Sequence, residues 1–353
     1  AALPLILDGF KKTPVRENLL AQAKSGSGKT AAFALGMLQN VDLTKPHVQG
    51  LCVCPTRELA TQNAAVVRLI GKTLVEEKGL VVALALSEGP SGGRGRGGRG
   101  RGRGARQEPI RGHIVVGTPG RTLQLIKARA LDTRGISMLV LDEADEMLDM
   151  GFKEDLEAIL NTTPEEKQTL MFSATVPKTI AKLAKDYQKD AVRITVGKSN
   201  AQHVDIEYKA FKIVSSDQEN AIINTLRYYE ATNSIIFCAT RMAVNHMTSR
   251  LTNRGISAVA LSGELSQNER NMALQAMRSS KARVCVATDV AARGLDLPNL
   301  DLVIHADIPR TSDTLLHRSG RTGRAGRKGV CVILVPQNRN RTCLLYTSPS
   351  PRD

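Results

Sequence analysis

The chain has 353 residues, more than one hydrophobic core usually organises, so we expect two domains of roughly 150 residues each. Lysine and arginine number 49 against 34 acidic residues, and the resulting net charge of +15 favours a polyanionic partner, either a nucleic acid or a membrane surface. Aromatic residues make up 3% of the chain without a tryptophan, which argues against a broad platform for stacking bases and favours binding through phosphates.

The apolar runs are too short for a membrane span, which needs about 18 consecutive apolar residues. The longest runs, such as 80–86, have the length of a buried strand, so we expect a soluble protein and take the cytoplasm as its location. Residues 1–7 show no basic leader or cleavage site that would indicate secretion. The six cysteines lie mostly in apolar runs, which favours packed thiols over a disulfide framework or a zinc site.

Short apolar runs alternate along the chain with segments of helical period, such as 146–160 and 242–253. This alternation predicts an α/β fold in which helices cover both faces of a mainly parallel sheet. A first series of strands is predicted at 18–22, 51–54, 80–86, 113–117, 138–142 and 169–172. A second series is predicted at 234–238, 258–261, 283–287, 302–305 and 330–335.

The polar stretch 196–205 separates the two series and contains no long apolar run. We therefore expect one α/β domain over 1–200 and a second over 201–340. Within the first, residues 91–106 read SGGRGRGGRGRGRGAR, with six arginines and no acid, which predicts a disordered basic loop. Two interpretations of this loop stay open: it condenses on RNA phosphates and stacks guanidinium groups on bases, or it is a low-complexity expansion that a loop tip tolerates.

A glycine-rich turn lies between a predicted strand and a helix-forming run. Residues 19–30 read LLAQAKSGSGKT, the context of a Walker A motif, although Ala23 occupies the first glycine position. In such a turn backbone N–H groups surround phosphate oxygens, Lys29 supplies charge to the β and γ phosphates, and the Thr30 hydroxyl ligates Mg²⁺. A chance glycine-rich turn is the alternative interpretation. The predicted nucleotide-binding residues are Ala23, Gly26, Ser27, Gly28, Lys29 and Thr30.

Two adjacent carboxylates follow the apolar strand at 138–142, at the sheet edge where parallel α/β folds bind ligands. Asp142 suits a role in holding Mg²⁺ through its water shell, and Glu143 suits a role in orienting and deprotonating the attacking water. An acidic cap on the following helix is the alternative, but it does not explain the pairing with a phosphate loop.

These residues resemble the DEAD-box RNA helicases of superfamily 2, because residues 142–145 spell the four letters of the family's name. The family's other motifs are matched in order by 55–60 (PTRELA), 118–121 (TPGR), 173–175 (SAT), 237–241 (FCATR), 288–296 (TDVAARGLD) and 317–324 (HRSGRTGR). The resemblance extends from residue 1 to about residue 336, and the sequence of the second half is similar to that of bacterial members. It implies two tandem RecA-like domains.

The resemblance also implies roles in hydrolysis. Arg321 and Arg324 would act as arginine fingers on the γ-phosphate, so that hydrolysis requires both domains to close on ATP. Asp296 matches the position that contacts the nucleotide ribose. The residues implied in coupling the nucleotide site to domain closure are Ser173, Thr175 and His317.

RNA would be held through its backbone, at loops that follow strands, without reading of base sequence. Recognition of the 2′-hydroxyl would favour RNA over DNA. The residues that match the family's RNA contacts are Arg57, Thr118, Gly120, Arg121, Arg241, Gly263, Arg270, Thr288 and Asp289. We expect a monomer.

Three departures from the family pattern stand out. Residues 9–16 imitate the upstream adenine-reading motif, but Arg16 stands where that motif has glutamine, so adenine selectivity is left open. The Arg-Gly stretch occupies the place of a glycine-doublet RNA motif, for which Gly92 and Gly93 could substitute. Residues 343–353, CLLYTSPSPRD, resemble a translated sequencing adapter, so we exclude them from the fold and expect a chain truncated at both ends.

The leading hypothesis is an ATP-dependent RNA helicase that uses Mg²⁺, clamps RNA and separates short duplexes or remodels ribonucleoproteins locally. An RNA-binding module with an inactive, truncated nucleotide site is the main alternative. A DNA translocase of the wider superfamily is a third hypothesis.

Overall fold

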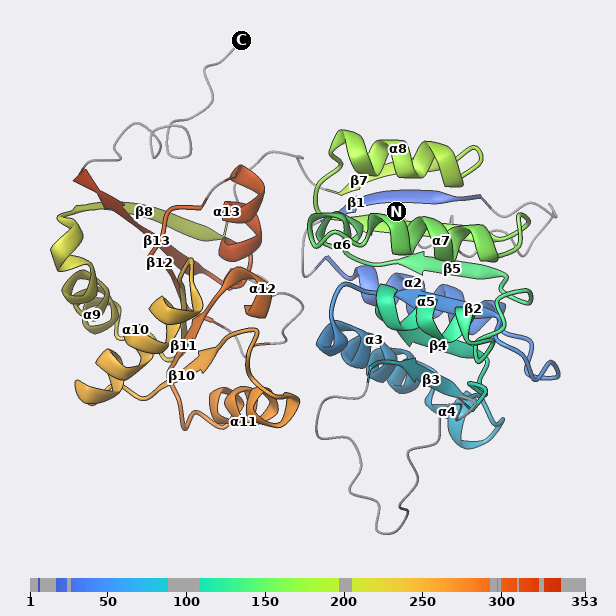
Figure 1. Cartoon of the computed structure of the whole chain (residues 1–353), viewed down its shortest axis with the longest axis horizontal. Coiled ribbons are helices and arrows are strands. Elements are labelled where there is room, and N and C mark those ends of the chain that lie inside the picture. Colours follow the sequence, from blue (N-terminus) through green and yellow to red (C-terminus); the bar gives the residue numbers. More distant parts are fainter. Residues whose placement is uncertain are drawn as a thin grey trace. The chain divides into compact units, whose positions relative to one another are not determined.

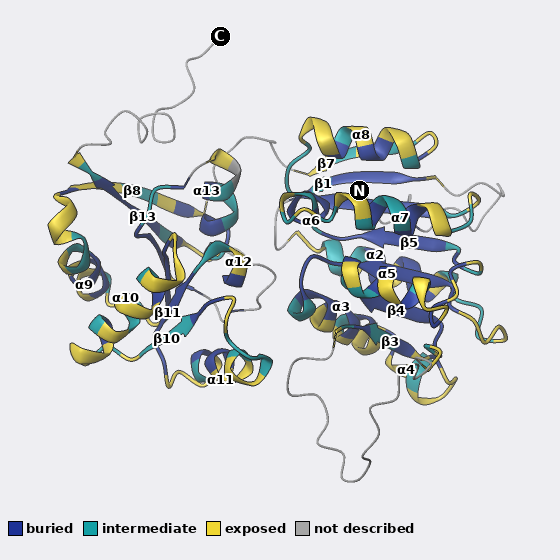
Figure 2. Ribbon diagram, in the orientation of Figure 1, coloured by how far each residue is buried: buried dark blue, intermediate teal, exposed yellow. Residues whose placement is uncertain are grey.

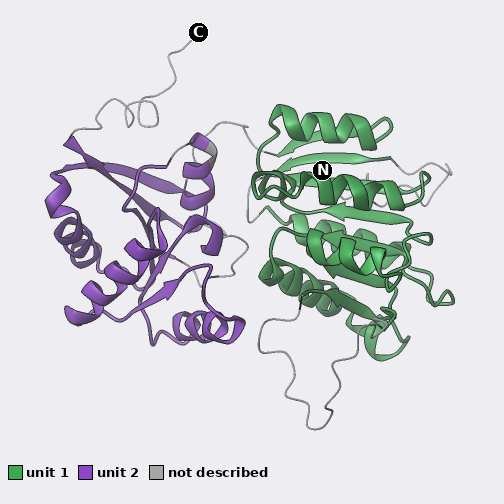
Figure 3. Ribbon diagram, viewed as in Figure 1, with its two compact units in different colours: residues 1–199 green, residues 200–353 purple. Residues whose placement is uncertain are grey.

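The structure is a computed structural model, and it describes residues 6, 17–23, 27–87, 108–196, 205–292, 297, 300–309, 311–323 and 327–337. Outside the described residues lie three predicted site residues and three stretches of sequence: Gly26, Asp296, Arg324, 9–16, 91–106 and 343–353. The chain divides into two compact units, residues 1–199 and 200–353 (Figure 3).

Unit 1 is built on one sheet with the strand order β3-β4-β2-β5-β6-β1-β7, and its strands pair in parallel (Figure 1). Its strands are β1 (Leu19–Ala23), β2 (Gly50–Val53), β3 (Val82–Ala85), β4 (Ile114–Gly117), β5 (Met138–Leu141), β6 (Gln168–Ser173) and β7 (Val192–Val196). Its helices are α2 (Lys29–Asn40), α3 (Arg57–Ile70), α4 (Lys72–Glu76), α5 (Pro119–Lys127), α6 (Ala144–Asp149), α7 (Lys153–Thr162) and α8 (Lys178–Tyr187).

Unit 2 has a parallel sheet with the strand order β10-β11-β9-β12-β13-β8. Its strands are β8 (Ile206–Ile213), β9 (Ser234–Phe237), β10 (Ala258–Leu261), β11 (Val284–Ala287), β12 (Leu302–His305) and β13 (Gly329–Pro336). Its helices are η2 (Ser215–Asp217), α9 (Gln218–Tyr229), α10 (Arg241–Asn253), α11 (Gln267–Arg278), α12 (Asp289–Ala292) and α13 (Ser312–Ser319).

The central strands are buried on both faces, which explains why they are continuously apolar (Figure 2). In β5, Leu139 and Leu141 belong to the core on one face of the sheet, and Met138 and Val140 belong to the core on the other. The predicted α/β class with helices over mainly parallel sheets is therefore confirmed in each unit.

Two strands were not predicted from the sequence. β7 and β8 flank the polar stretch 196–205, and both are edge strands: β7 contains no fully buried residue, and β8 is buried only at its two ends. In β8 the charged residues Glu207 and Lys209 sit between buried ends, so no apolar run marks the strand. Because much of each of these edge strands is exposed to solvent, polar residues are tolerated in it, and its sequence resembles that of a loop.

The helix predicted over 146–160 is wrong as a single element. The chain forms α6 and then α7, and Gly151 between them has φ +85, in the left-handed region. Glycine reaches this region without steric cost, so it ends the first helix and redirects the chain. Within the described part of the chain, the helices include none with both the length and the apolar character that a bilayer crossing requires.

Candidate nucleotide and RNA site

The glycine-rich turn leads from the end of β1 into the first turn of α2. Gly28 is the N-cap of α2 with φ +84, a left-handed conformation that suits glycine. No acidic side chain lies in the first turn of this helix. The free N–H groups of a helix N-terminus attract anions, and no carboxylate of this turn competes for them. The N-terminus of α2 therefore fits a phosphate group.

Lys29 is the first residue of α2, and its Nζ donates a hydrogen bond to the backbone oxygen of Ala23 at 2.8 Å. This bond spans the turn from the helix to the end of β1. It ties the ammonium group to the end of β1, where a point charge serves phosphate binding. Ser27 precedes Gly28 and is exposed, while Thr30 is half-buried in the same helical turn as Lys29.

Asp142 directly follows β5 and is 2% exposed. Its Oδ2 accepts a hydrogen bond from Asn63 Nδ2 at 2.8 Å, whereas its Oδ1 is buried and meets no hydrogen-bond partner among the described residues. Burial raises the pKa of this carboxyl, and the positive charge of Lys29 and the bond from Asn63 offset part of that rise.

A buried carboxylate oxygen without a partner is costly, and a bound cation would satisfy it. Across the described ranges, no group of three or more acidic, histidine or cysteine residues could hold a metal ion unaided. Mg²⁺ bound with nucleotide does not require such a group, because it takes one or two carboxylates together with phosphates and waters. Asp142 therefore fits the Mg²⁺ that a nucleotide brings.

Glu143 forms the sharp turn between β5 and α6. It is the N-cap of α6 and has φ +52, which is uncommon for a residue with a side chain. Residues held in such conformations concentrate at functional sites, where the surrounding structure imposes them. The conformation of Glu143 is consistent with a role fixed by the fold.

The SAT segment is joined to the DEAD segment through Asp145. Its Oδ2 accepts hydrogen bonds from the backbone N of Thr175 at 2.8 Å and from Thr175 Oγ1 at 2.9 Å. The buried Ser173 hydroxyl donates to the backbone oxygen of Thr175 and so braces the same turn. The structure thus brings Ser173 and Thr175 to the turn after Asp142, through a residue to which sequence reasoning gave no role.

The predicted RNA residues of unit 1 lie where α3 and α5 begin, after the neighbouring strands β2 and β4. Arg57 opens α3 behind its N-cap Thr56, whose side chain accepts a hydrogen bond from Leu59 N. Thr118 is the N-cap of α5, Gly120 is exposed in its first turn, and Arg121 bonds Gln124 Oε1 at 2.7 Å. These residues therefore share one edge of the sheet.

In unit 2 the predicted RNA residues follow β9, β10 and β11, which are adjacent in the sheet. Arg241 opens α10 and pairs with Glu264, and Arg270 in α11 donates to the backbone oxygen of Ala291 at 2.7 Å. The remaining predicted residues are the exposed Gly263 after β10, and Thr288 and Asp289 after β11.

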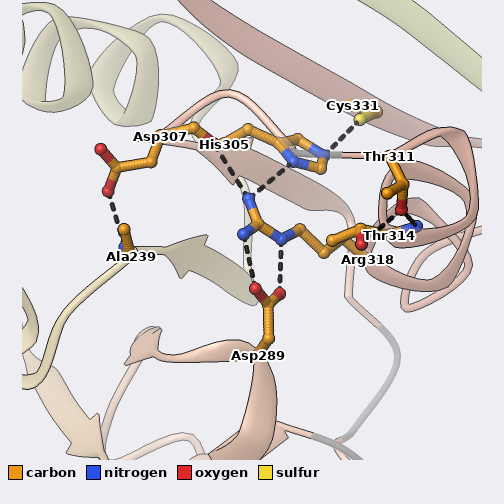
Figure 4. Close-up of polar contacts among 8 residues, drawn as sticks. All are labelled: Ala239, Asp289, His305, Asp307, Thr311, Thr314, Arg318 and Cys331. Carbon is orange, nitrogen blue, oxygen red and sulfur yellow. Dashed lines mark hydrogen bonds and ion pairs between the residues drawn. The ribbon is translucent and has the colours of Figure 1, made fainter. Parts of the chain in front are cut away.

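The carboxylate of Asp289 is held by a residue that sequence reasoning missed (Figure 4). Arg318, 5% exposed, donates from Nε and Nη2 to the two oxygens of Asp289 at 2.5 and 2.7 Å. Its Nη1 donates to the backbone oxygen of Asp307 at 2.9 Å, and its guanidinium lies 5.1 Å from the ring centroid of Phe237. The motif segments 288–296 and 317–324 are thereby joined inside one unit.

A neutral histidine completes this cluster. His305 is fully buried between Arg318 and Cys331, with Nδ1 3.4 Å from Arg318 Nη1 and Nε2 3.2 Å from Cys331 Sγ. Burial lowers the pKa of His305 well below its usual value, and the charge of Arg318 lowers it further. His305 therefore accepts from Arg318 rather than repelling it.

His317 and Arg321 lie in and after the last turn of α13, which also carries Arg318. Arg321 follows Gly320, the C-cap of α13, so the position of its backbone depends on that helix.

Comparison with known proteins identifies the family. A model of the DEAD/DEAH box helicase family matches residues 1–183, and a model of the helicase conserved C-terminal domain matches residues 217–326. The chain belongs to the DEAD-box family of ATP-dependent RNA helicases. The resemblance that the motifs predicted is confirmed.

Relatives from different kingdoms are similar over most of the chain. Eukaryotic initiation factor 4A of Caenorhabditis elegans is 35% identical, with 91% of this chain and 77% of the relative covered. The helicase DeaD of Buchnera aphidicola is 37% identical, with 98% and 54% covered. The helicase CshA of Bacillus cereus is 37% identical, with 90% and 58% covered. The chain thus spans little more than half of these two bacterial relatives.

Solved DEAD-box structures share the fold. Saccharomyces cerevisiae Dbp5 bound to RNA and ADP BeF3 superposes with a TM-score of 0.83 at 30% identity, covering 98% of this chain and 85% of that chain. Both units are therefore RecA-like, as the family resemblance implied.

Proposed function

We propose that this chain hydrolyses ATP in a reaction stimulated by RNA, and that it uses hydrolysis to separate short RNA duplexes or remodel ribonucleoproteins. The observation that carries the proposal is the buried Asp142 carboxylate, with one oxygen unpartnered among the described residues, beside the charge of Lys29. Family membership supports it, as does the likeness to Saccharomyces cerevisiae Dbp5 bound to RNA and ADP BeF3.

Unit 1 would supply the nucleotide site. The N–H groups of the turn ending at Gly28 and the ammonium of Lys29 would bind the phosphates. Thr30 and Asp142 would hold Mg²⁺, which when bound neutralises the charge that develops on the phosphates. Glu143 would orient the attacking water and accept its proton. The ribose contact would come from Asp296.

Unit 2 would supply the remaining catalytic charges. We propose Arg321 and Arg324 as arginine fingers that stabilise the γ-phosphate as it transfers. His317, on the same helix end, would help to link them to the Asp142 strand. His317 and Arg321 both lie at the C-terminal end of α13. The ion pair between Arg318 and Asp289 would therefore fix the position of the backbone from which the arginine fingers extend.

RNA would lie along the basic loop ends of both units, with phosphates rather than bases as the contact points. The contact proposed for Asp289 would use its backbone, because Arg318 occupies its carboxylate. The five described cysteines are free and buried, which supports a reducing compartment such as the cytoplasm. We expect the chain to act as a monomer.

The test compares ATP hydrolysis with and without single-stranded RNA in the wild type and in Glu143→Gln. We expect RNA to accelerate the wild type, and the variant to lose activity by on the order of 100-fold or more because it lacks the general base. Glu166→Gln, which changes an exposed glutamate of the same unit, serves as the matched control and should keep wild-type rates. Hydrolysis that ignores RNA, or that survives in Glu143→Gln, contradicts the proposal.

The RNA-binding module with an inactive nucleotide site is not favoured by these relatives. It predicts salt-sensitive RNA binding that does not respond to a non-hydrolysable ATP analogue. A filter-binding titration with and without the analogue separates the two, and competition by DNA of equal sequence tests the translocase hypothesis.

A further inference from the structure

One polar residue interrupts the buried face of α3. Asn63 is 0% exposed and lies in the middle of a stripe whose other members are apolar. The stripe consists of Leu59, Ala60, Asn63, Ala64 and Val67. Its apolar members all belong to one core cluster of unit 1. Burying an amide in such a stripe is unfavourable unless the amide is hydrogen-bonded, so its partners indicate what it does there.

The partners of Asn63 lie at the nucleotide site. Its Nδ2 donates to Asp142 Oδ2 at 2.8 Å, across 79 residues of sequence, and to Cys54 Sγ at 3.3 Å. An ionised carboxylate only accepts hydrogen bonds, so the amide must turn its nitrogen toward Asp142. The thiol is a weak acceptor, which makes the carboxylate the stronger of the two partners.

The bond to Asn63 gives the two carboxylate oxygens of Asp142 different environments. Oδ2 is held by the amide, and Oδ1 is left buried and without a partner in the described part of the chain. Side chains that orient a metal-binding carboxylate act in this way, because they fix its rotamer and leave one oxygen to the metal or its waters.

We propose that Asn63 is a positioning residue that fixes Asp142 for Mg²⁺. The proposal rests on the role of Asp142 proposed above. Packing alone does not require the amide, since the other positions of the stripe are apolar. Cys54 does not require it either, because burial raises the pKa of its thiol well above the usual value and keeps the thiol neutral.

The test measures metal affinity directly. Mn²⁺, which takes the oxygen ligands of Mg²⁺, is titrated into the full chain saturated with ADP, and free Mn²⁺ is followed by electron paramagnetic resonance. We expect Asn63→Leu, which keeps the branched shape and removes the donor, to weaken Mn²⁺ affinity about 10- to 100-fold. Asn63→Ala, which cannot overpack the core, should weaken it in the same direction.

Asn18→Leu is the matched control. Asn18 is also a buried asparagine of unit 1, but its side chain bonds the backbone oxygen of Lys189 and the backbone N of Thr169. It should lose stability and keep wild-type Mn²⁺ affinity. Asp142→Asn should lose Mn²⁺ affinity at least as strongly as the Asn63 variants.

Wild-type Mn²⁺ affinity in both Asn63 variants, with affinity lost in Asp142→Asn, would overturn the positioning role alone. Wild-type affinity in Asp142→Asn would overturn the proposed metal site itself. Unfolding temperatures of all four variants separate the loss of a positioned carboxylate from a loss of folded protein.

Discussion

At the scale of single residues, two polar side chains show what motifs leave out. Lys29 was identified from sequence by its glycine-rich motif, and Asp142 by its place directly after an apolar strand. Asn63 and Arg318 were missed because a buried amide or guanidinium is recognised only by its partners. Those partners, Asp142 and Asp289, lie 79 and 29 residues away.

Replacing Arg318 by lysine tests whether its fork geometry matters. Lysine keeps the charge but cannot make the paired bonds to Asp289 or place a guanidinium over Phe237, so we expect the free energy of unfolding to fall by about 2 kcal/mol. Urea titration of the full chain measures the loss. Arg283→Lys, at an exposed arginine, should change it little. Equal stability of Arg318→Lys and the wild type would show that charge alone suffices.

At the scale of elements, burial decided what could be predicted. The central strands β5 and β12 were placed to within one residue because they are apolar on both faces. The edge strands β7 and β8 were not predicted, because both are partly exposed to solvent and polar residues interrupt the apolar ones in their sequences. The break between α6 and α7 was missed because an amphipathic period continues across Gly151.

Two glycines with open space around them test the cause of that break. A Cβ at Gly151 or at Gly263 would meet no atom within 4 Å, but only Gly151 of the pair has a positive φ. We expect Gly151→Ala to lower the free energy of unfolding by about 1 kcal/mol through backbone strain, and Gly263→Ala to change it much less. Thermal unfolding monitored by circular dichroism measures both. Equal losses would mean that backbone conformation is not the cause.

At the scale of the whole molecule, the buried His305 links stability to pH. Its pKa is lowered in the folded chain, so below about pH 6.5 the unfolded state binds a proton that the folded state excludes. The stabilising contribution is complete above that pH and is lost as the pH falls through it. We expect the free energy of unfolding to fall by up to about 1.4 kcal/mol per pH unit from this group.

Urea titrations between pH 7.5 and 5.5, a range chosen to lie above most carboxyl pKa values, would measure this slope. His305→Asn removes the titrating ring and should flatten the dependence. A slope that persists unchanged in His305→Asn would assign it to other groups.

The helix α3 has a thermodynamic consequence of its own. Arg57, a proposed RNA contact, is its first residue, and Asn63, which holds Asp142, follows six residues later, about 9 Å along the axis. RNA bound at Arg57 and metal bound at Asp142 would therefore act on the same rigid helix. Any factor by which bound RNA changes metal affinity through that helix must equal the factor by which bound metal changes RNA affinity. Such reciprocity needs no signal from the second unit.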